Sequence, residues 1–361
     1  MFPEGLRYLF IECTQSLGKG IAMDIIDLRS DTVTLPTQEM LDSIMNAELG
    51  DDVSREDPTV NKLEQMSSEK FGKEAALLVP SGTAGNLISV MTHCRHGDEM
   101  ICEAEAHIYY YEVGGFSAVA GVIPRLIKGN RGVFTAEQLE SAYRGRELHF
   151  PNPALLEIEN THNRAGGTCW TPRQVEEVSK VAKDRMMKVH MDGARVFNAA
   201  VALQVDVKDY ARHVDSLSFC LSKGLSCPVG SVLVGDKEFI DRARKNRKVL
   251  GGGMRQAGII AAPGIIAITK MVDRLREDHD NAKRLAVGLQ RECGLRIDME
   301  TVQTNIVVAD VSPNRSTDFL SKAKRNGILA SNFGKHQVRF VTHRGIASED
   351  IDDTLERLQS N

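Results

Sequence analysis

Short apolar runs alternate with amphipathic stretches along most of this chain. The run Ala75–Val79 is apolar throughout, as is typical of a strand that is buried on both faces of a sheet. Similar runs predict further strands at Glu99–Cys102, Val122–Ile127, Leu155–Ile158, Lys188–Met191, Ser216–Cys220 and Ser231–Val234. Helical periodicity separates these runs, for example at Thr135–Tyr143 and Pro172–Lys183. This alternation predicts an α/β domain with a mostly parallel sheet flanked by helices.

Further elements are expected before and after this alternating region. Near the start, Asp57 is a plausible N-cap for a helix that begins at Pro58. Further on, the segment Arg255–Arg284 reads as helix with little interruption, and a smaller α+β unit follows it. Its strands are expected at Thr304–Val308 and Val338–Val341, and its helices at Ser316–Arg325 and Ile351–Leu358. We therefore expect a tail at 1–24, a large domain at 25–265 and a small C-terminal domain at 266–361.

Composition and charge narrow the class of protein. The 361 residues are 42% apolar, and 45 basic against 49 acidic side chains give a net charge of −4. That balance lacks the basic face that nucleic acid requires, and no apolar run approaches the roughly 18 residues of a membrane span. The seven cysteines include no C-x-x-C pair, so we expect free thiols and a cytoplasmic protein. Residues 1–24 lack the long apolar region of a secretion signal and are interpreted as an appended tail.

Candidate chemistry lies just after the apolar strands, where parallel sheets bind their ligands. Ser81–Gly85 precedes a helix, and its small residues suit a phosphate held at the helix N-terminus, although a plain turn would look the same. His107 is followed by three tyrosines, which suit either stacking on a flat ligand or simple aromatic packing. Asp192 ends another strand, where a desolvated carboxylate needs a positive partner unless it only forms an Asp-Gly turn.

Two cations complete this set. Lys223 follows Ser216–Cys220, where a desolvated lysine is a usable amine nucleophile and an exposed one merely packs its stem on the sheet. Arg339 lies within Val338–Val341, where it either holds a carboxylate or points into solvent. An anion cradle, a ring stacker, a carboxylate for a ring nitrogen and a lysine amine together suit one cofactor, pyridoxal 5′-phosphate. No metal site is indicated.

Seven motifs in order resemble those of the low-specificity threonine aldolases, which are fold-type I pyridoxal-phosphate enzymes. The motifs are Asp27–Thr32, Gly50–Val53, Val79–Thr83, Glu159–Asn163, His190–Arg195, Leu221–Gly224 and Gly251–Gln256, and the resemblance runs from about Ile26 to the C-terminus. It implies a carbon–carbon lyase that cleaves L-threonine or L-allo-threonine to glycine and acetaldehyde. It also implies a homotetramer, built as a dimer of dimers with shared active sites.

The same resemblance implies a role for each matching residue. Lys223 would bind the cofactor aldehyde covalently, Asp192 would pair with the pyridine nitrogen, and His107 would stack on the ring. Ser81, Gly82 and Thr83 would hold the phosphate, and Lys248 and Arg255 would reach the phosphate of a neighbouring subunit. Ser30, Arg195 and Arg339 would bind the substrate carboxylate, with Arg195 also beside the cofactor.

The base, one loop and the reaction type stay open at this level. The base that takes the β-hydroxyl proton would be His107 or His149, directly or through a held water. The family commonly has Val-Tyr-Gly where this chain has Val53–Ser54–Arg55, so the contribution of that loop is undecided. A β-eliminating lyase or an amino-acid racemase on the same fold would use the same Lys223 and Asp192. A non-catalytic protein that binds pyridoxal phosphate is the remaining alternative.

Overall fold

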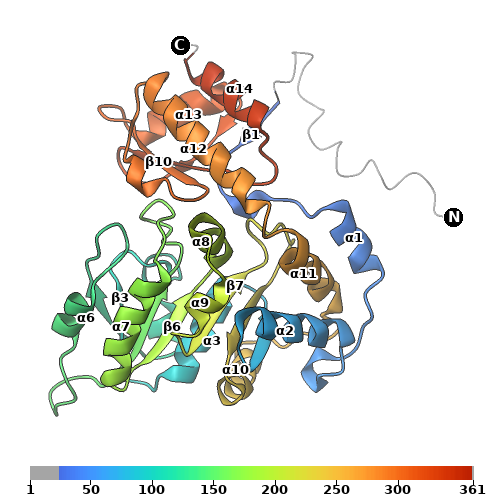
Figure 1. The fold of residues 1–361 in the computed structure, drawn as a ribbon, viewed down its shortest axis with the longest axis vertical. Helices are drawn as coiled ribbons and strands as arrows, with labels where there is room; N and C mark the ends of the chain where they lie inside the picture. The colour runs from blue at the N-terminus through green and yellow to red at the C-terminus, as the bar shows by residue number, and fades with distance from the viewer. Residues whose placement is uncertain (1–23, 360–361) are drawn as a thin grey trace.

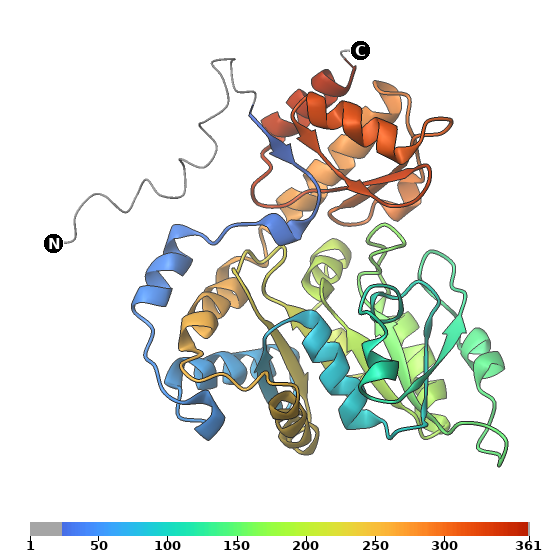
Figure 2. The same cartoon turned by 180° about the vertical axis from the view of Figure 1, so that it is seen from behind.

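The computed structural model describes residues 24–359, which form two packed units joined by the long helix α12 (Leu275–Arg291) (Figure 1). Most of the tail expected at 1–24 lies outside these residues. The view from behind shows the same arrangement, with the smaller unit above one end of the larger one (Figure 2). Within residues 24–359, no helix combines the length and the apolar character needed to cross a membrane. The six cysteines in this part of the chain are all free, and Cys13 lies outside it.

The core of the large unit is a seven-stranded sheet with the order β2-β8-β7-β6-β5-β3-β4. Neighbours from β4 to β7 pair in parallel, whereas β8 runs against both of its neighbours. The predicted mostly parallel sheet is therefore confirmed, and each predicted strand is found nearly to the residue. The strands are β2 (Ala75–Val79), β3 (Glu99–Glu103), β4 (Ile123–Ile127), β5 (Pro153–Glu159), β6 (Lys188–Asp192), β7 (Ser216–Cys220) and β8 (Ser231–Gly235).

Helices cover both faces of this sheet. The predicted N-cap is confirmed, because the Asp57 side chain accepts a hydrogen bond from the backbone N–H of Val60 at 3.0 Å. The helices of the large unit are α1 (Gln38–Met45), α2 (Pro58–Phe71), α3 (Gly82–His93), α4 (His107–Tyr110), α5 (Gly115–Ala118), α6 (Ala136–Ala142), α7 (Pro172–Asp184), α8 (Val196–Leu203), α9 (Val207–Ala211), α10 (Lys237–Val249) and α11 (Gly258–Lys270). Short 3-10 turns lie at Asp31–Val33, Asp52–Ser54 and Met299–Thr301.

The two faces of the sheet differ in character because side chains alternate along each strand. One face packs on α2, α7, α8 and α9 through apolar side chains, among them Val189, Met191, Leu217 and Phe219. The other face lies under α3 and carries a row of buried polar side chains from β5, β6 and β7. The row consists of Glu157, Glu159, His190, Asp192, Ser216 and Ser218. It leads to the carboxyl ends of the strands, where the candidate chemistry lies.

The smaller unit has its own core around a four-stranded antiparallel sheet with the order β12-β13-β10-β9. The first described strand, β1 (Ile26–Asp27), pairs in parallel with β11 (Ile328–Leu329), so Ile26 and Leu28 pack in this second core. The domain boundaries 25–265 and 266–361 stay a prediction. The remaining elements are β9 (Arg296–Ile297), β10 (Ile306–Asp310), α13 (Ser316–Arg325), β12 (Ser331–Asn332), β13 (Gln337–Val341) and α14 (Ser348–Gln359).

The segment Arg255–Arg284, expected to be helical with little interruption, forms two helices, α11 and α12. The chain turns at Met271–Arg274, between the two helices. The reason is tertiary packing: Leu275 still packs in the core of the large unit, whereas Ala282 and Leu285 pack in the second core. One straight helix from Arg255 could not serve both cores.

Candidate active site

The predicted site residues of the large unit meet at the carboxyl edge of the sheet, on the side that faces the smaller unit (Figure 1). Asp192 is the last residue of β6 and Glu159 the last of β5, and Lys223 follows β7. Because these strands are parallel neighbours, their ends lie side by side. Arg339 comes from β13 of the smaller unit, and its Nη1 donates to Oδ1 of Asn163, in the segment that follows β5, at 2.7 Å. The site is therefore built from both units.

Asp192 is buried and yet held as a carboxylate. Its Oδ2 accepts a hydrogen bond from Nδ2 of Asn86 at 2.8 Å, and its Oδ1 accepts one from the backbone N–H of Ala194 at 3.0 Å. Burial alone would raise the pKa of Asp192, but the positive charges of His107 and Lys223 and the Asn86 hydrogen bond bring it below the usual range. The predicted positive partner of this carboxylate is thus supplied in part by the protein.

His107 begins α4 and faces the same carboxylate. Its Nδ1 lies 2.9 Å from Oε1 of the buried Glu112, and its backbone N–H donates to Glu159. Burial lowers the pKa of His107, but the hydrogen bond to Glu112 and the charges of Asp192 and Glu159 raise it above the usual value. Ligand atoms of His107, Glu112 and Asp192 lie within 4.8 Å of one another. Since Asn86 donates to both carboxylates, we interpret the group as a hydrogen-bonded cluster that would receive a protonated ring nitrogen.

Lys223 lies in a turn whose backbone is fixed on two sides. The carbonyl of Lys223 accepts from Oγ1 of Thr34 at 2.9 Å and from the backbone N–H of Ser226 at 2.8 Å. Its side-chain charge helps lower the pKa of both Asp31 and Asp192, so the amine lies near both carboxylates. That position suits an amine that must reach a ligand lying over Asp192.

The N-terminus of α3 forms the predicted anion cradle. Ser81 is the N-cap and its Oγ accepts from the backbone N–H of Ala84 at 3.2 Å. The N–H groups of Gly82 and Thr83 belong to the first turn, where backbone donors have no intrahelical partner. A Cβ at Gly82 would lie 2.9 Å from Sγ of Cys220, so a larger residue would push the cradle away from β7. Close packing against β7 thus requires the small residue at Gly82.

Three residues were predicted to bind a carboxylate, and the structure distinguishes among them. Arg195 forms a two-pronged ion pair with the buried Asp31, with both N···O distances at 2.7 Å, which uses its Nε and one terminal nitrogen. Arg339 instead keeps a buried Nε without a partner among the described residues. Burial and the nearby Arg195 charge lower the pKa of Arg339 to about 10. Ser30 caps the adjacent turn, with its Oγ accepting from Thr32.

Lys248 and Arg255 lie on the surface near the carboxyl end of α10, and the Arg255 side chain is 62% exposed. Arg255 pairs with Asp51 at 2.8 Å. In the loop that departs from the family pattern, Arg55 adopts a left-handed conformation with φ 61°, which L-residues rarely adopt, and it pairs with Asp241 at 2.6 Å. The predicted reach of Lys248 and Arg255 into a neighbouring subunit stays a prediction.

Proteins with known names align with this chain over almost its whole length. A family model described as β-eliminating lyase matches residues 27–312. Low-specificity L-threonine aldolase 1 of Arabidopsis thaliana is 42% identical over 346 residues, which are 94% of this chain and 97% of that protein. The low specificity L-threonine aldolase of Escherichia coli K12 is 40% identical over 328 residues, covering 91% of this chain and 96% of that one. The chain belongs to the low-specificity L-threonine aldolase family.

Solved structures agree on the fold of this aldolase family. A threonine aldolase of Leishmania major superposes with a TM-score of 0.80 at 20% identity, covering 92% of this chain and 98% of that one. Serine palmitoyltransferase of Sphingomonas wittichii superposes with a TM-score of 0.73 at 17% identity, covering 93% and 86%. At these identities the likeness shows the fold alone, which is the fold-type I arrangement predicted from the sequence.

The structure places His149 of this aldolase-family chain away from the carboxyl edge of the sheet, and its role as a base stays a prediction. It lies in the exposed loop that precedes β5. Asp192 and Glu159 lie at the opposite, carboxyl ends of the parallel strands. The length of the strands therefore separates His149 from Asp192. His107 lies at the carboxyl edge, and so does the buried His162, whose Nε2 is 3.7 Å from Oε2 of Glu159.

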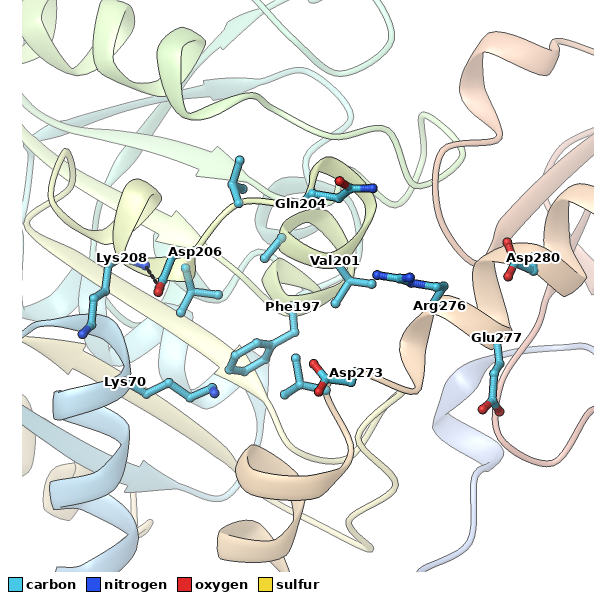
Figure 3. A pocket seen from close by; sticks show the side chains of 14 residues that line it. Lys70, Phe197, Val201, Gln204, Asp206, Lys208, Asp273, Arg276, Glu277 and Asp280 are labelled. Carbon is cyan, nitrogen blue, oxygen red and sulfur yellow. Dashed lines mark hydrogen bonds between the residues drawn. The ribbon is translucent and has the colours of Figure 1, made fainter.

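A cavity of about 910 Å³ lies outside the aldolase site (Figure 3). It opens between α8 and the turn that joins α11 to α12, where Phe197 and Val201 face Arg276 and Asp273 across it. Phe197 belongs to the apolar core on the far face of the sheet from Asp192. The cavity mixes basic and acidic side chains and carries none of the predicted site residues.

Sequence reasoning missed three residues that the structure places in the site. Asn86 and Glu112 contact Asp192 and His107, and Asp31 holds Arg195. Asp31 was within reach, because it lies in a motif that carried the family resemblance. Asn86 is one turn into the helix behind the phosphate cradle, a position where a buried amide in an otherwise apolar helix is the available signal.

Proposed function

We propose that this chain is a pyridoxal-phosphate-dependent aldolase that cleaves L-threonine and L-allo-threonine to glycine and acetaldehyde. The observation that carries the proposal is the cluster around Asp192: a buried, hydrogen-bonded carboxylate with Lys223 and His107 at the same edge of the sheet. The curated relatives at 40–42% identity carry the name of this activity, which supports the same reaction here.

The residues of the site fit the cofactor. Gly82 and Thr83 at the start of α3 suit the phosphate, and Asp192 suits a protonated pyridine nitrogen. Lys223 would hold the aldehyde carbon, and His107 would lie on the face of the ring. Pyridoxal phosphate, when bound, supplies an electron sink for the bond that is cleaved.

Arg339 is the carboxylate binder that the structure favours. Its buried Nε has no partner within residues 24–359, and its guanidinium lies 5.3 Å from the ring centre of Phe333. A substrate carboxylate would accept a hydrogen bond from that nitrogen. It would also offset the repulsion between the positive charges of Arg339 and Arg195. Arg195 keeps Asp31 and the Ser30 turn in place, so we propose that its contribution to carboxylate binding is mainly to position that turn.

His107 is the base we propose for the β-hydroxyl proton. Since Glu112 occupies Nδ1, the other ring nitrogen Nε2 is the one that can accept a proton from the substrate. Glu112, Asp192 and Glu159 raise the pKa of His107 against the effect of burial, which strengthens it as a base. The proton taken from the hydroxyl stays on His107 while the Cα–Cβ bond breaks and the aldehyde leaves.

The test is release of acetaldehyde and glycine from each substrate by the purified protein, with Lys223→Ala alongside. The proposal expects both products from the wild type and neither from the variant. Pyruvate, or an amino acid of inverted configuration, without aldehyde would replace the aldolase with a β-eliminating lyase or a racemase. A protein that binds the cofactor and releases nothing would be the non-catalytic alternative.

We further propose that the enzyme acts in the cytoplasm as a homotetramer, a dimer of dimers with shared sites. The cytoplasmic location is supported by six free cysteines among residues 24–359. Shared sites are supported by Lys248 and Arg255, two cations exposed at the surface of one subunit.

A further inference from the structure

A chain of hydrogen bonds runs between α3 and the sheet and ends at Asp192. Nε2 of His93, at the end of α3, lies 2.7 Å from Oγ of Ser216 on β7. The same oxygen lies 2.9 Å from Nδ1 of His190 on β6. On the other side of that ring, Nε2 lies 3.3 Å from Oδ1 of Asn86, whose Nδ2 donates to Asp192. No residue of this chain of bonds except Asp192 has a part in the mechanism above.

The chemistry of the end groups fixes the direction of every bond. An ionised Asp192 only accepts, so the NH₂ group of Asn86 must face it and the amide oxygen must face away. That oxygen can only accept, so Nε2 of His190 must carry the proton. In a neutral ring Nδ1 is then bare, and it must accept the hydroxyl proton of Ser216. All donors therefore point toward Asp192.

Asn86 lies in the middle of this chain of bonds, and every hydrogen-bonding group of its side-chain amide has a partner. Its two N–H groups donate to Asp192 and to Glu112, both at 2.8 Å. Its oxygen accepts from His190 and also from Oγ of Ser218 at 3.0 Å. Every donor and acceptor of a buried amide is thus satisfied, so no rotated form of Asn86 would do as well.

The surroundings favour uncharged histidines at both positions. Burial lowers the pKa of His190 to about 4, and burial holds the pKa of His93 well below its usual value. Glu157 lies opposite His190 on β5, and both of its buried oxygens lack partners among the described residues. Burial and the charge of Asp192 raise the pKa of Glu157 well above its usual value, so a protonated Glu157 does not compete for the His190 proton.

We propose that His190 and Asn86 are positioning residues: His190, held in its neutral Nε2–H form, fixes the amide of Asn86 so that both N–H groups point at Asp192 and Glu112. This inference rests on the proposed function, because Asp192 is the group that would pair with the cofactor ring. The result is a carboxylate that stays ionised inside the protein and keeps a ring nitrogen protonated.

The first test reads the form of the ring and needs no cofactor chemistry. Nitrogen NMR of ¹⁵N-histidine-labelled protein, with the His190 signals assigned by their loss in His190→Gln, should show a neutral Nε2–H ring. The signals should not move from neutral pH down to about pH 5. An Nδ1–H or a charged ring would overturn the proposal. Since this readout survives even if the aldolase activity is absent, the two failures are distinguishable.

The second test reads the effect on the cofactor. His190→Phe removes the donor to Asn86, and we expect about tenfold weaker binding of pyridoxal phosphate and an altered pH dependence of its visible absorption. His190→Gln places an N–H near the position of Nε2 and should restore most of both properties. Equal effects of the two substitutions would contradict a hydrogen-bonding role.

If His190→Phe fails to fold, Ser216→Ala provides a milder test, because it removes only one buried hydroxyl. Without the Ser216 donor, Nδ1 of His190 loses its partner, and NMR should show a mixture of the two neutral ring forms. Ser89→Ala is the matched control, since Ser89 is a buried serine of α3 that donates only to the Gly85 carbonyl at 2.8 Å. Identical His190 signals in both variants would overturn the proposed order of donors.

Discussion

At the scale of single residues, the site shows how a charge is kept inside a protein. A carboxylate without partners would be neutralised on burial, since transfer out of water disfavours its charged form. Asp192 avoids this through two hydrogen bonds, through the nearby Lys223 amine and, while His107 carries a proton, through the charge of His107. Arg339 shows the opposite situation, because burial next to Arg195 disfavours its charge and leaves a nitrogen available to a ligand.

Replacing Asp192 by asparagine tests the role of its charge. The Asn86 contact would be strained but the shape kept, while the negative charge opposite the ring nitrogen would be lost. We expect kcat to fall by on the order of a thousandfold, because the electron sink would no longer be stabilised in the transition state. Steady-state kinetics, with circular dichroism to confirm the fold, checks this. A loss of less than tenfold would mean that the charge of Asp192 is not used.

Replacing Arg339 by lysine tests the carboxylate site. Lysine keeps a positive charge but cannot present the planar fork that matches a carboxylate, so we expect KM for L-threonine to rise by about tenfold or more, with a smaller change in kcat. The matched control is Arg296→Lys, which replaces an exposed arginine on β9 of the same sheet that pairs with Asp310. An unchanged KM in Arg339→Lys would mean that Arg195 and Ser30, not Arg339, bind the substrate carboxylate.

The sequence allowed part of this site to be predicted. Asp192, His107 and Lys223 could be predicted because each polar residue lies at or shortly after the end of an apolar strand, a local signal. Asn86 could not be identified in this way, because its partner Asp192 is 106 residues away and only the fold brings them together. The pairing that occupies Arg195 was missed for the same reason, since Asp31 is 164 residues distant.

At the scale of elements, α12 links the two units. His279 of α12 accepts a hydrogen bond from Nδ2 of Asn198 on α8, at 3.2 Å. Asn198 also donates to Asn305, next to β10 of the smaller unit, at 3.3 Å. This contact between the units therefore requires an unprotonated Nε2 on His279. Protonation of that nitrogen would break the hydrogen bond from Asn198.

Acid should weaken this contact. Burial lowers the pKa of His279 to about 4, whereas in the unfolded chain it is about 6.5. The unfolded state binds the proton first, so stability is full above about pH 6.5 and falls as the pH approaches 4. We expect His279→Gln, which accepts without titrating, to reduce the loss of unfolding free energy between pH 7 and about pH 4.5 by about 2 kcal/mol.

Urea unfolding at several pH values measures this slope. His149→Gln is the control, because its ring is exposed in the loop before β5 and has no buried environment to lose. The same pH slope in wild type and His279→Gln would show that this contact does not sense acid. His190 also has a lowered pKa, so part of the slope should remain in either variant.

Most elements were predictable because they are short and locally marked. The apolar run Ala75–Val79 is a strand as expected, and Asp57 caps α2. The turn between α11 and α12 was not predictable, because Met271–Arg274 contains neither glycine nor proline and two separate cores impose the break. The pairing of β1 with β11 joins residues at opposite ends of the chain, which no local pattern reports.

At the scale of the whole molecule, one subunit supplies part of a phosphate-binding site. It also exposes at its surface cations that would complete the site of a neighbouring subunit. The first turn of α3 gives a phosphate backbone donors and a favourable helix dipole. A positive side chain from outside would complete the neutralisation. Lys248 and Arg255 are exposed cations near the end of α10, and the family resemblance directs them to the neighbouring subunit's site.

Mixing two inactive variants tests whether sites are shared. In a dimer of Lys223→Ala with the double variant Lys248→Ala/Arg255→Ala, one site combines both defects and the other contains none. Random pairing from an equal mixture, unfolded and refolded together, makes half of the dimers mixed, so about a quarter of wild-type activity should return. Lys223→Ala mixed with Asp192→Asn is the control, because both defects lie in the same chain's part of the site and no pairing removes them. Recovery in neither mixture would mean that each subunit holds its own complete site, and Lys248 and Arg255 would then act in the site of their own chain.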